Sequence, residues 1–114
     1  MQRKTVDTPT ESDQFEFEIG KFSFNSKLRF LSFSGEEAIK LSPKENDLLR
    51  MLAINLNDLM TRESALTKIW RDDNYFTSRS MDVYIAKLRK YLKLDPNVEI
   101  LNIHGEGFLS LINI

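Results

Sequence analysis

Hydrophobic and polar residues alternate along the chain from Phe15 onward. Phe15, Phe17 and Ile19 are separated by single glutamates, and the alternation resumes after Gly20 and Lys21. A period of two is typical of half-buried antiparallel strands. The pattern therefore predicts a small sheet rich in phenylalanine, with strands at about 15–19, 22–24, 27–33 and 38–41.

Two features interrupt this alternation. Phe30 and Leu31 are adjacent apolar residues, which indicates a bulge or a strand end within the third strand. The segment 34–37, Ser-Gly-Glu-Glu, has the composition of a turn. We therefore expect the last short strand to begin after this turn.

The residues from Ser42 to Glu45 predict the start of a helix. Ser42 is a good N-cap, Pro43 suits the first helical position, and Glu45 is placed to complete a capping box. Asn55 offers a C-terminal stop, so we expect a helix over about 43–55. Its apolar stripe is Leu48, Leu49, Leu52, Ala53 and Leu56.

Two further helices are expected after the first. Thr61 is an N-cap for a short second helix that ends near Trp70 and turns Ala65, Leu66 and Ile69 inward. Thr77 or Ser78 is the expected cap of a third helix, which extends to about Lys93. The core stripe of this third helix is predicted to be Met81, Ile85, Leu88 and Leu92.

The outward side of the third helix is rich in bases. At 100° per residue, the side opposite the core stripe carries Arg79, Val83, Ala86, Lys87 and Lys90, while Tyr84 and Arg89 fall on the two flanks. The segment 77–93 has a local charge of +4, although the whole chain has a net charge of −1. Positive charge is therefore concentrated on this helix.

The chain ends in a predicted hairpin. Asp95-Pro96-Asn97 ends the third helix, and the segments 98–103 and 108–112 have strand character, with His104 to Gly107 between them. A sheet, three helices and a hairpin follow one another in the order of a winged helix. In that arrangement the third helix enters the major groove of DNA and the hairpin forms the wing.

Several segments resemble the effector domain of OmpR/PhoB-type response regulators, over about residues 15–112. They are Arg62-Glu63 through Trp70, the run Arg79-Ser80-Met81-Asp82-Val83-Tyr84-Ile85, Lys87-Leu88-Arg89-Lys90, and His104-Gly105-Glu106-Gly107-Phe108. The resemblance implies an α+β fold: a winged helix-turn-helix with an N-terminal four-stranded antiparallel sheet, three helices and a C-terminal β-hairpin wing. It also implies sequence-specific binding of double-stranded DNA, as the output domain of a two-component response regulator.

The resemblance also implies roles for individual residues. The expected base contacts are Val83, Lys87 and Arg79, of which Arg79 is also a candidate for phosphate. The expected phosphate contacts are Thr61, Arg62, Trp70, Tyr84, Arg89 and Lys90. The wing residues are His104, Gly105 and Gly107. A loop that could touch RNA polymerase comprises Arg71, Asp72, Asp73, Asn74 and Tyr75.

The chain departs from the family pattern in its wing. Members usually end the wing in a Gly-Tyr-Arg-Phe type sequence whose arginine reaches the minor groove, whereas this chain has Gly107-Phe108-Leu109-Ser110. Glu106 adds a negative charge nearby, and Ala86 stands where relatives often carry a base. We therefore expect the third helix to carry more of the binding, with dimerisation or His104 of greater importance.

The ends and the composition limit the other possibilities. Residues 1–14 resemble an interdomain linker, so we expect a longer protein with a receiver domain before residues 15–114. The chain has no cysteine and no apolar stretch of about 20 residues, and we expect a cytoplasmic protein without membrane contact, metal or cofactor. No catalytic arrangement of residues is recognisable, so no enzyme activity is predicted.

Two hypotheses for the function remain open. The first is a transcription regulator that is monomeric in isolation and binds direct-repeat half-sites as a homodimer, with RNA polymerase as a candidate partner. The second is a winged-helix protein-interaction module without direct DNA readout, which the near-neutral charge, Glu106 and the missing wing arginine favour. Basic residues on one helix face are often only a solvated surface.

Overall fold

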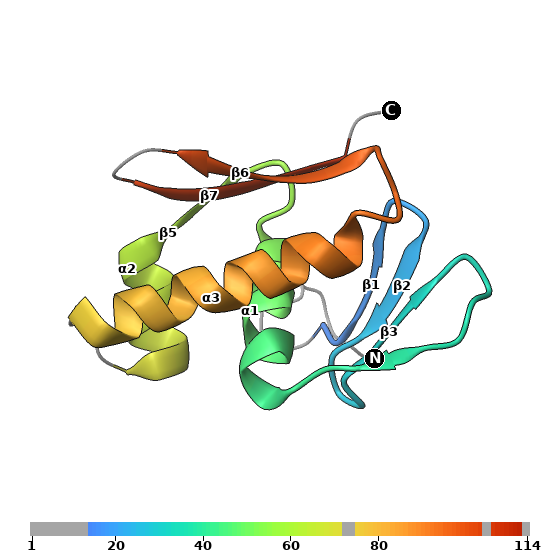
Figure 1. The fold of residues 1–114 in the computed structure, drawn as a ribbon, viewed down its shortest axis with the longest axis horizontal. Coiled ribbons are helices and arrows are strands. Elements are labelled where there is room, and N and C mark those ends of the chain that lie inside the picture. The colour runs from blue at the N-terminus through green and yellow to red at the C-terminus, as the bar shows by residue number, and fades with distance from the viewer. Residues whose placement is uncertain (1–13, 72–74, 104–105, 113–114) are drawn as a thin grey trace, which may run out of the picture.

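The computed structural model describes residues 14–71, 75–103 and 106–112, with the backbone alone at 75, 76, 111 and 112. Two antiparallel sheets and three helices share one buried core. The long helix α3 (Tyr75–Leu92) runs across the molecule, with the N-terminal sheet beyond its C-terminal end and α2 beside its N-terminal end (Figure 1). No helix among the described residues has the length and apolar character to cross a membrane.

The four-stranded N-terminal sheet is confirmed. Its strands pair in chain order, each with the next. Phe17, Ile19, Phe22 and Phe24 are buried, as the alternation predicts, and Glu16, Glu18 and Ser23 point outward. The strands are β1 (Glu16–Ile19), β2 (Phe22–Asn25), β3 (Phe30–Phe33) and β4 (Ile39–Lys40).

The expected strand over 27–33 is too long by three residues. The Asn25 carboxamide oxygen accepts hydrogen bonds from the backbone N–H groups of Lys27 and Leu28, both at 3.0 Å, and so turns the chain. Arg29 has a φ of 64°, which no strand residue adopts. The adjacent pair Phe30 and Leu31 therefore marks where the strand begins.

The predicted start of the first helix is confirmed in α1 (Pro43–Ile54). The Ser42 hydroxyl accepts a hydrogen bond from the Glu45 N–H, and the Glu45 carboxylate accepts one from the Ser42 N–H at 2.8 Å. The second carboxylate oxygen of Glu45 accepts a 3.0 Å hydrogen bond from the Tyr91 hydroxyl in α3. Partial burial, followed by this hydrogen bond, raises the pKa of Tyr91. The capping box therefore also ties α1 to α3.

The second helix combines two kinds of turn. It begins as α2 (Arg62–Ala65), capped by the Thr61 hydroxyl as predicted, and continues in a π-helical turn, η3 (Leu66–Trp70). Ala65, Leu66 and Ile69 are buried, which confirms the predicted inward face. Arg71 ends the segment with a φ of 62°.

The third helix starts earlier than the sequence predicts. Neither Thr77 nor Ser78 is its cap, because α3 already begins at Tyr75. The Ser78 hydroxyl instead accepts a 2.6 Å hydrogen bond from the Arg62 guanidinium. The core stripe is confirmed, since Met81, Ile85, Leu88 and Leu92 are all at most 3% exposed.

The C-terminal hairpin belongs to a three-stranded sheet of order β5-β7-β6. The strands β6 (Val98–Ile103) and β7 (Gly107–Ile112) confirm the predicted hairpin, while β5 (Leu59–Thr61) was not predicted. β5 has only three residues, and its partner β7 lies beyond two helices in the chain. A local hydrophobic pattern therefore could not reveal it.

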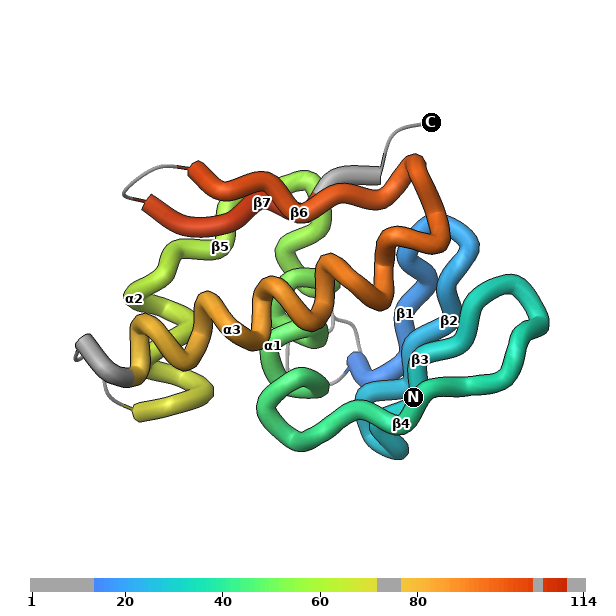
Figure 2. The backbone as a smooth tube through the Cα atoms, in the orientation of Figure 1, coloured from blue at the N-terminus to red at the C-terminus, as the bar shows by residue number. Residues whose placement is uncertain are grey.

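Asp95 joins the two sheets. Its carboxylate accepts hydrogen bonds from the Asn97 N–H at 2.9 Å and from the Lys21 N–H, in the β1–β2 turn, at 2.8 Å. Figure 2 shows the segment after α3 passing this turn before it enters β6. The bond from Asn97, and then that from Lys21, holds the pKa of Asp95 below its usual value. Ionised Asp95 therefore fixes the end of α3.

Candidate nucleic-acid interface

The outer face of α3 combines one apolar side chain with several bases. Arg79, Lys87 and Lys90 are exposed there, and Val83 is 55% exposed although it is apolar. A shallow depression on the same face is lined by Arg79, Ser80, Asp82, Val83 and Ala86. The face predicted for base contacts is therefore open to solvent, with its core stripe turned to the opposite side.

A basic groove lies between the end of α3 and the wing strand β6. Arg89 and Lys90 line it from the helix, Lys93 from the residue that follows the helix, and Ile100 and the acidic Glu99 from the strand. The Arg89 guanidinium donates a 3.1 Å hydrogen bond from Nε to the Ile100 carbonyl oxygen. This bond fixes the Arg89 stem against the wing and is compatible with a second contact from the remaining N–H groups. Lys93 was not among the predicted contacts, although it lies in the same basic segment.

Two aromatic rings connect the second and third helices. Trp70 and Tyr84 lie with ring centroids 5.9 Å apart and ring planes at 51°. Both side chains are half-buried. The Lys87 Nζ lies 5.2 Å from the Tyr84 ring centroid. The predicted phosphate contacts Trp70 and Tyr84 are thus brought together, next to the predicted base contact Lys87.

Arg62 is held by α3. Its guanidinium forms a 2.9 Å ion pair with Asp82 and donates to the Ser78 hydroxyl and carbonyl oxygens, at 2.6 and 3.2 Å. It also lies 5.4 Å from the Phe108 ring centroid. Its predicted phosphate contact stays untested, and the structure adds a second role: Arg62 joins α2, α3 and β7. Thr61, beside it, is exposed while its hydroxyl accepts from the Ser64 N–H.

The wing is attached to β5 through Gly107. A Cβ at this position would overlap the Met60 carbonyl oxygen and lie 2.8 Å from the Thr61 Cα. Gly107 is therefore required by strand packing. The other predicted wing residues, His104 and Gly105, lie outside the described residues.

Leu109 occupies the wing position where the family resemblance led us to expect arginine. It is half-buried and pairs with Leu59 on β5 and Leu101 on β6. Leu59, Leu109 and Leu101 therefore form a row of apolar side chains across the wing sheet. This row lies where the sequence lacks the arginine of the family pattern. Glu106, the residue before β7, is exposed.

The predicted polymerase loop is only partly described. Arg71 is exposed, whereas Asp72, Asp73 and Asn74 lie outside the described residues. Tyr75 is the first residue of α3, so its placement in the loop was wrong. The loop is therefore shorter than the sequence predicts.

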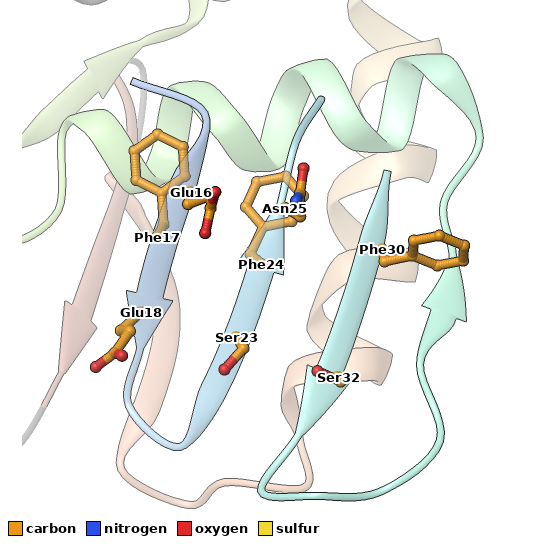
Figure 3. Close-up of a pocket in the computed structure, with 8 residues that line it drawn as sticks. All are labelled: Glu16, Phe17, Glu18, Ser23, Phe24, Asn25, Phe30 and Ser32. Carbon is orange, nitrogen blue, oxygen red and sulfur yellow. The ribbon is translucent and has the colours of Figure 1, made fainter. Parts of the chain in front are cut away.

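The N-terminal sheet carries acidic groups on its outer face. A shallow pocket there is lined by Glu16, Glu18, Ser23, Asn25 and Ser32, with the exposed Phe30 at its edge, whereas Phe17 and Phe24 belong to the buried side of the sheet (Figure 3). Carboxylates repel the phosphates of DNA. The two glutamates therefore make this pocket a poor site for DNA, although Lys40 lies beside it, with its Nζ 4.6 Å from the Phe30 ring centroid.

Known proteins share both the sequence pattern and the fold. A family model described as the C-terminal domain of transcriptional regulatory proteins matches residues 35–110. Transcriptional regulatory protein RprY of Bacteroides fragilis is 50% identical over 92 residues, which cover 81% of this chain and 39% of that protein. The chain spans between 39% and 42% of the length of the curated relatives it matches.

Two solved DNA-binding domains have the same fold. The domain of CpxR from E. coli is 22% identical and matches with a TM-score of 0.76, over 87% of this chain and 98% of that one. The Klebsiella pneumoniae RstA domain, solved in complex with its RstA box, is 27% identical with a TM-score of 0.71, over 86% and 98% of the two chains. The chain therefore belongs to the family of C-terminal domains of transcriptional regulatory proteins, the OmpR/PhoB-type DNA-binding domains that its motifs resemble.

Proposed function

We propose that residues 15–114 bind double-stranded DNA sequence-specifically, with α3 in the major groove, and that they are the output domain of a response regulator. The observation that carries this proposal is Val83, an apolar side chain 55% exposed on a basic helix face. An exposed valine suits the methyl group of thymine, and a neighbouring lysine suits the acceptors of guanine.

The proposal divides the contacts into two groups. Val83, Lys87 and Arg79 contact bases from the outer face of α3. Phosphates are contacted by Thr61, Arg62, Trp70, Tyr84, Arg89 and Lys90, and Lys93 joins them from the basic groove. Phosphate contacts fix the position of the domain on DNA, whereas base contacts select the sequence.

A binding titration tests this division. Duplexes selected in vitro from a random pool are titrated by fluorescence anisotropy at several salt concentrations. Lys87→Ala is expected to cost about 1–3 kcal/mol on the preferred duplex and much less on unrelated ones. Arg89→Ala is expected to weaken all duplexes alike and to reduce the salt slope by about one.

Lys27→Ala is the matched control, because it removes an exposed lysine next to the N-terminal sheet. It should leave both affinity and specificity close to those of the parent. Absence of binding to every duplex, or an affinity that does not change with salt, would refute the proposal. Equal effects of Lys87→Ala and Arg89→Ala on every sequence would refute the division of contacts.

The proposal extends to the whole protein. A receiver domain before a linker at residues 1–14 would promote dimerisation on phosphorylation, and two copies would bind direct-repeat half-sites about one helical turn apart. The RstA domain was solved on its DNA box, which supports a DNA partner for this domain. RNA polymerase would contact the loop at Arg71, and the protein would act in the cytoplasm without catalytic activity of this domain.

One observation favours the second candidate function. Leu109 stands in place of the wing arginine of the family pattern, and it forms an apolar row with Leu59 and Leu101. A winged helix that binds protein alone would show amide chemical-shift changes in α3 with that protein, and these changes would persist when DNA is added. Displacement of the protein by the selected duplex would rule out this alternative.

A further inference from the structure

Lys44, in the first turn of α1, reaches the end of the second helix. Its Nζ donates a 2.8 Å hydrogen bond to the Ile69 carbonyl oxygen and lies 5.5 Å from the Trp70 ring centroid. The side chain is half-buried. A lysine that belonged only to the surface of α1 would not be held by two groups of another helix.

The end of η3 needs such a donor. The last carbonyl groups of a helix lack partners within it, and the end of the helix favours a positive charge. Here the Arg71 N–H bonds back to the Leu66 carbonyl oxygen, and Lys44 supplies the donor for Ile69. The ammonium group of Lys44 thus fixes the turn that carries Trp70.

Trp70 in turn contacts Tyr84 in α3. Its ring lies 5.9 Å from that of Tyr84, and Tyr84 has the Lys87 Nζ 5.2 Å from its centroid. Two rings with a base at each end therefore form a row that runs from α1 through η3 to α3: Lys44, Trp70, Tyr84 and Lys87. We call this row the Lys44 ladder.

We infer that Lys44 is a positioning residue of the DNA interface: it holds Trp70 and, through Trp70, sets the places of Tyr84 and Lys87. This inference rests on the proposed DNA-binding function. Sequence reasoning missed Lys44 because it lies far from Trp70 in the chain and shares no periodic pattern with it. A direct contact of Lys44 with phosphate is the competing explanation, and the experiment separates the two.

Fluorescence tests the ladder without DNA. Trp70 is the only tryptophan in the chain, so its emission reports this site alone. Lys44→Met keeps the apolar stem and removes the donor, and it should shift the emission to longer wavelength and increase acrylamide quenching, because the ring becomes more exposed to water. Lys44→Arg keeps a cation and a donor, so it should restore most of the parent spectrum.

Lys40→Met is the matched control. The Lys40 Nζ lies 4.6 Å from the Phe30 ring centroid, so this variant also removes one charge and one contact between a cation and an aromatic ring, but on the N-terminal sheet. It should leave the Trp70 emission unchanged. If Lys44→Met proves too unstable, Lys44→Gln, which retains a shorter donor, is measured at the same temperature below its Tm.

DNA titrations complete the experiment on the same selected duplex. Lys44→Met should weaken binding about threefold, with an unchanged salt slope, because it disturbs Trp70 and Tyr84 and removes no phosphate contact of its own. Lys40→Met should change the affinity by much less. A salt slope reduced by about one would make Lys44 a phosphate contact and overturn the inference.

The failures are distinguishable. An unchanged Trp70 emission in Lys44→Met, or an affinity loss equal to that of Lys40→Met, would overturn the positioning role even if the parent binds DNA. A parent chain that binds no duplex would overturn the proposed function, whatever the emission shows. If Lys44→Arg does not restore both the Trp70 emission and the DNA affinity, that result would also contradict the positioning role of Lys44.

Discussion

The two sheets of this domain are built in different ways. In the N-terminal sheet each strand pairs with the next along the chain, and the outer face carries Glu16 and Glu18. In the wing sheet, β5 pairs with β7 across two helices, and β6 lies beside the basic end of α3. The comparison indicates that the wing sheet positions the helices of the proposed interface. A substitution that disturbs the wing sheet should therefore weaken DNA binding, whereas a similar substitution in the N-terminal sheet should not.

The largest effect is expected from Gly107→Ala, with Gly35→Ala, in the turn between β3 and β4 of the N-terminal sheet, as its counterpart. The new Cβ at 107 would overlap the Met60 carbonyl oxygen, whereas a Cβ at 35 meets nothing within 4 Å. Gly107→Ala should lower the free energy of unfolding by about 2–3 kcal/mol, since backbone must move. Gly35→Ala should cost about 1 kcal/mol, because its φ of 85° strains any side chain.

Urea unfolding followed by circular dichroism measures both variants. Gly107→Ala should also weaken binding to the selected duplex, because it displaces the wing from β5, the strand that leads into α2. Gly35→Ala should bind like the parent once the folded fraction is taken into account. Equal losses of stability, or a weaker affinity for Gly35→Ala alone, would contradict the distinction between the sheets.

The features that the sequence predicts are those encoded by near neighbours. The capping box needs only Ser42 and Glu45, three residues apart, and the core stripe of α3 follows from helical spacing. The N-terminal strands follow from strict alternation of residues that pair in chain order. The open face of α3, with Val83 and Lys87, was predictable for the same reason. One buried stripe determines which residues of a helix point outward.

The features that were missed depend on distant partners. β5 exists because β7 pairs with it, and the start of α3 was misplaced because Ser78 bonds to Arg62 rather than capping its own helix. The contact of Lys44 with Trp70 likewise joins different helices. In each case the polar group has several possible partners, and only the packing of the helices selects one. Local propensity contains no information on that choice.

The second-largest effect is expected from Asp95→Asn, which changes the side chain that connects the two sheets. The carboxylate accepts backbone hydrogen bonds from Asn97 and Lys21, and these lower its pKa. Because the folded pKa lies below the unfolded value, this stabilisation is present above about pH 4 and is lost as the pH falls further. Asp95→Asn should therefore lower Tm at pH 7 by less than Gly107→Ala does. Its Tm should approach that of the parent below pH 4.

Thermal unfolding between pH 2.5 and 7 measures this convergence. Asp47→Asn, which removes an exposed carboxylate from α1, is the control and should follow the parent at every pH. A difference in Tm between Asp95→Asn and the parent that stays constant over this range would show that the charge of Asp95 does not stabilise the junction.

The smallest effect is expected from Leu109→Arg, which would give the wing the base that the family pattern contains. The arginine stem can lie along Leu59 and Leu101 while its guanidinium reaches solvent, so the fold should tolerate the change. If the wing approaches the minor groove, affinity for the selected duplex should rise about threefold to tenfold. The salt slope should become steeper by about one.

Ser32→Arg is the control, because it places the same charge near Glu16 and Glu18 on the outer face of the N-terminal sheet. It should change neither the affinity nor the salt slope. Because both variants change the net charge equally, a similar gain from Ser32→Arg would mean that overall charge, and not the position of the wing, governs binding.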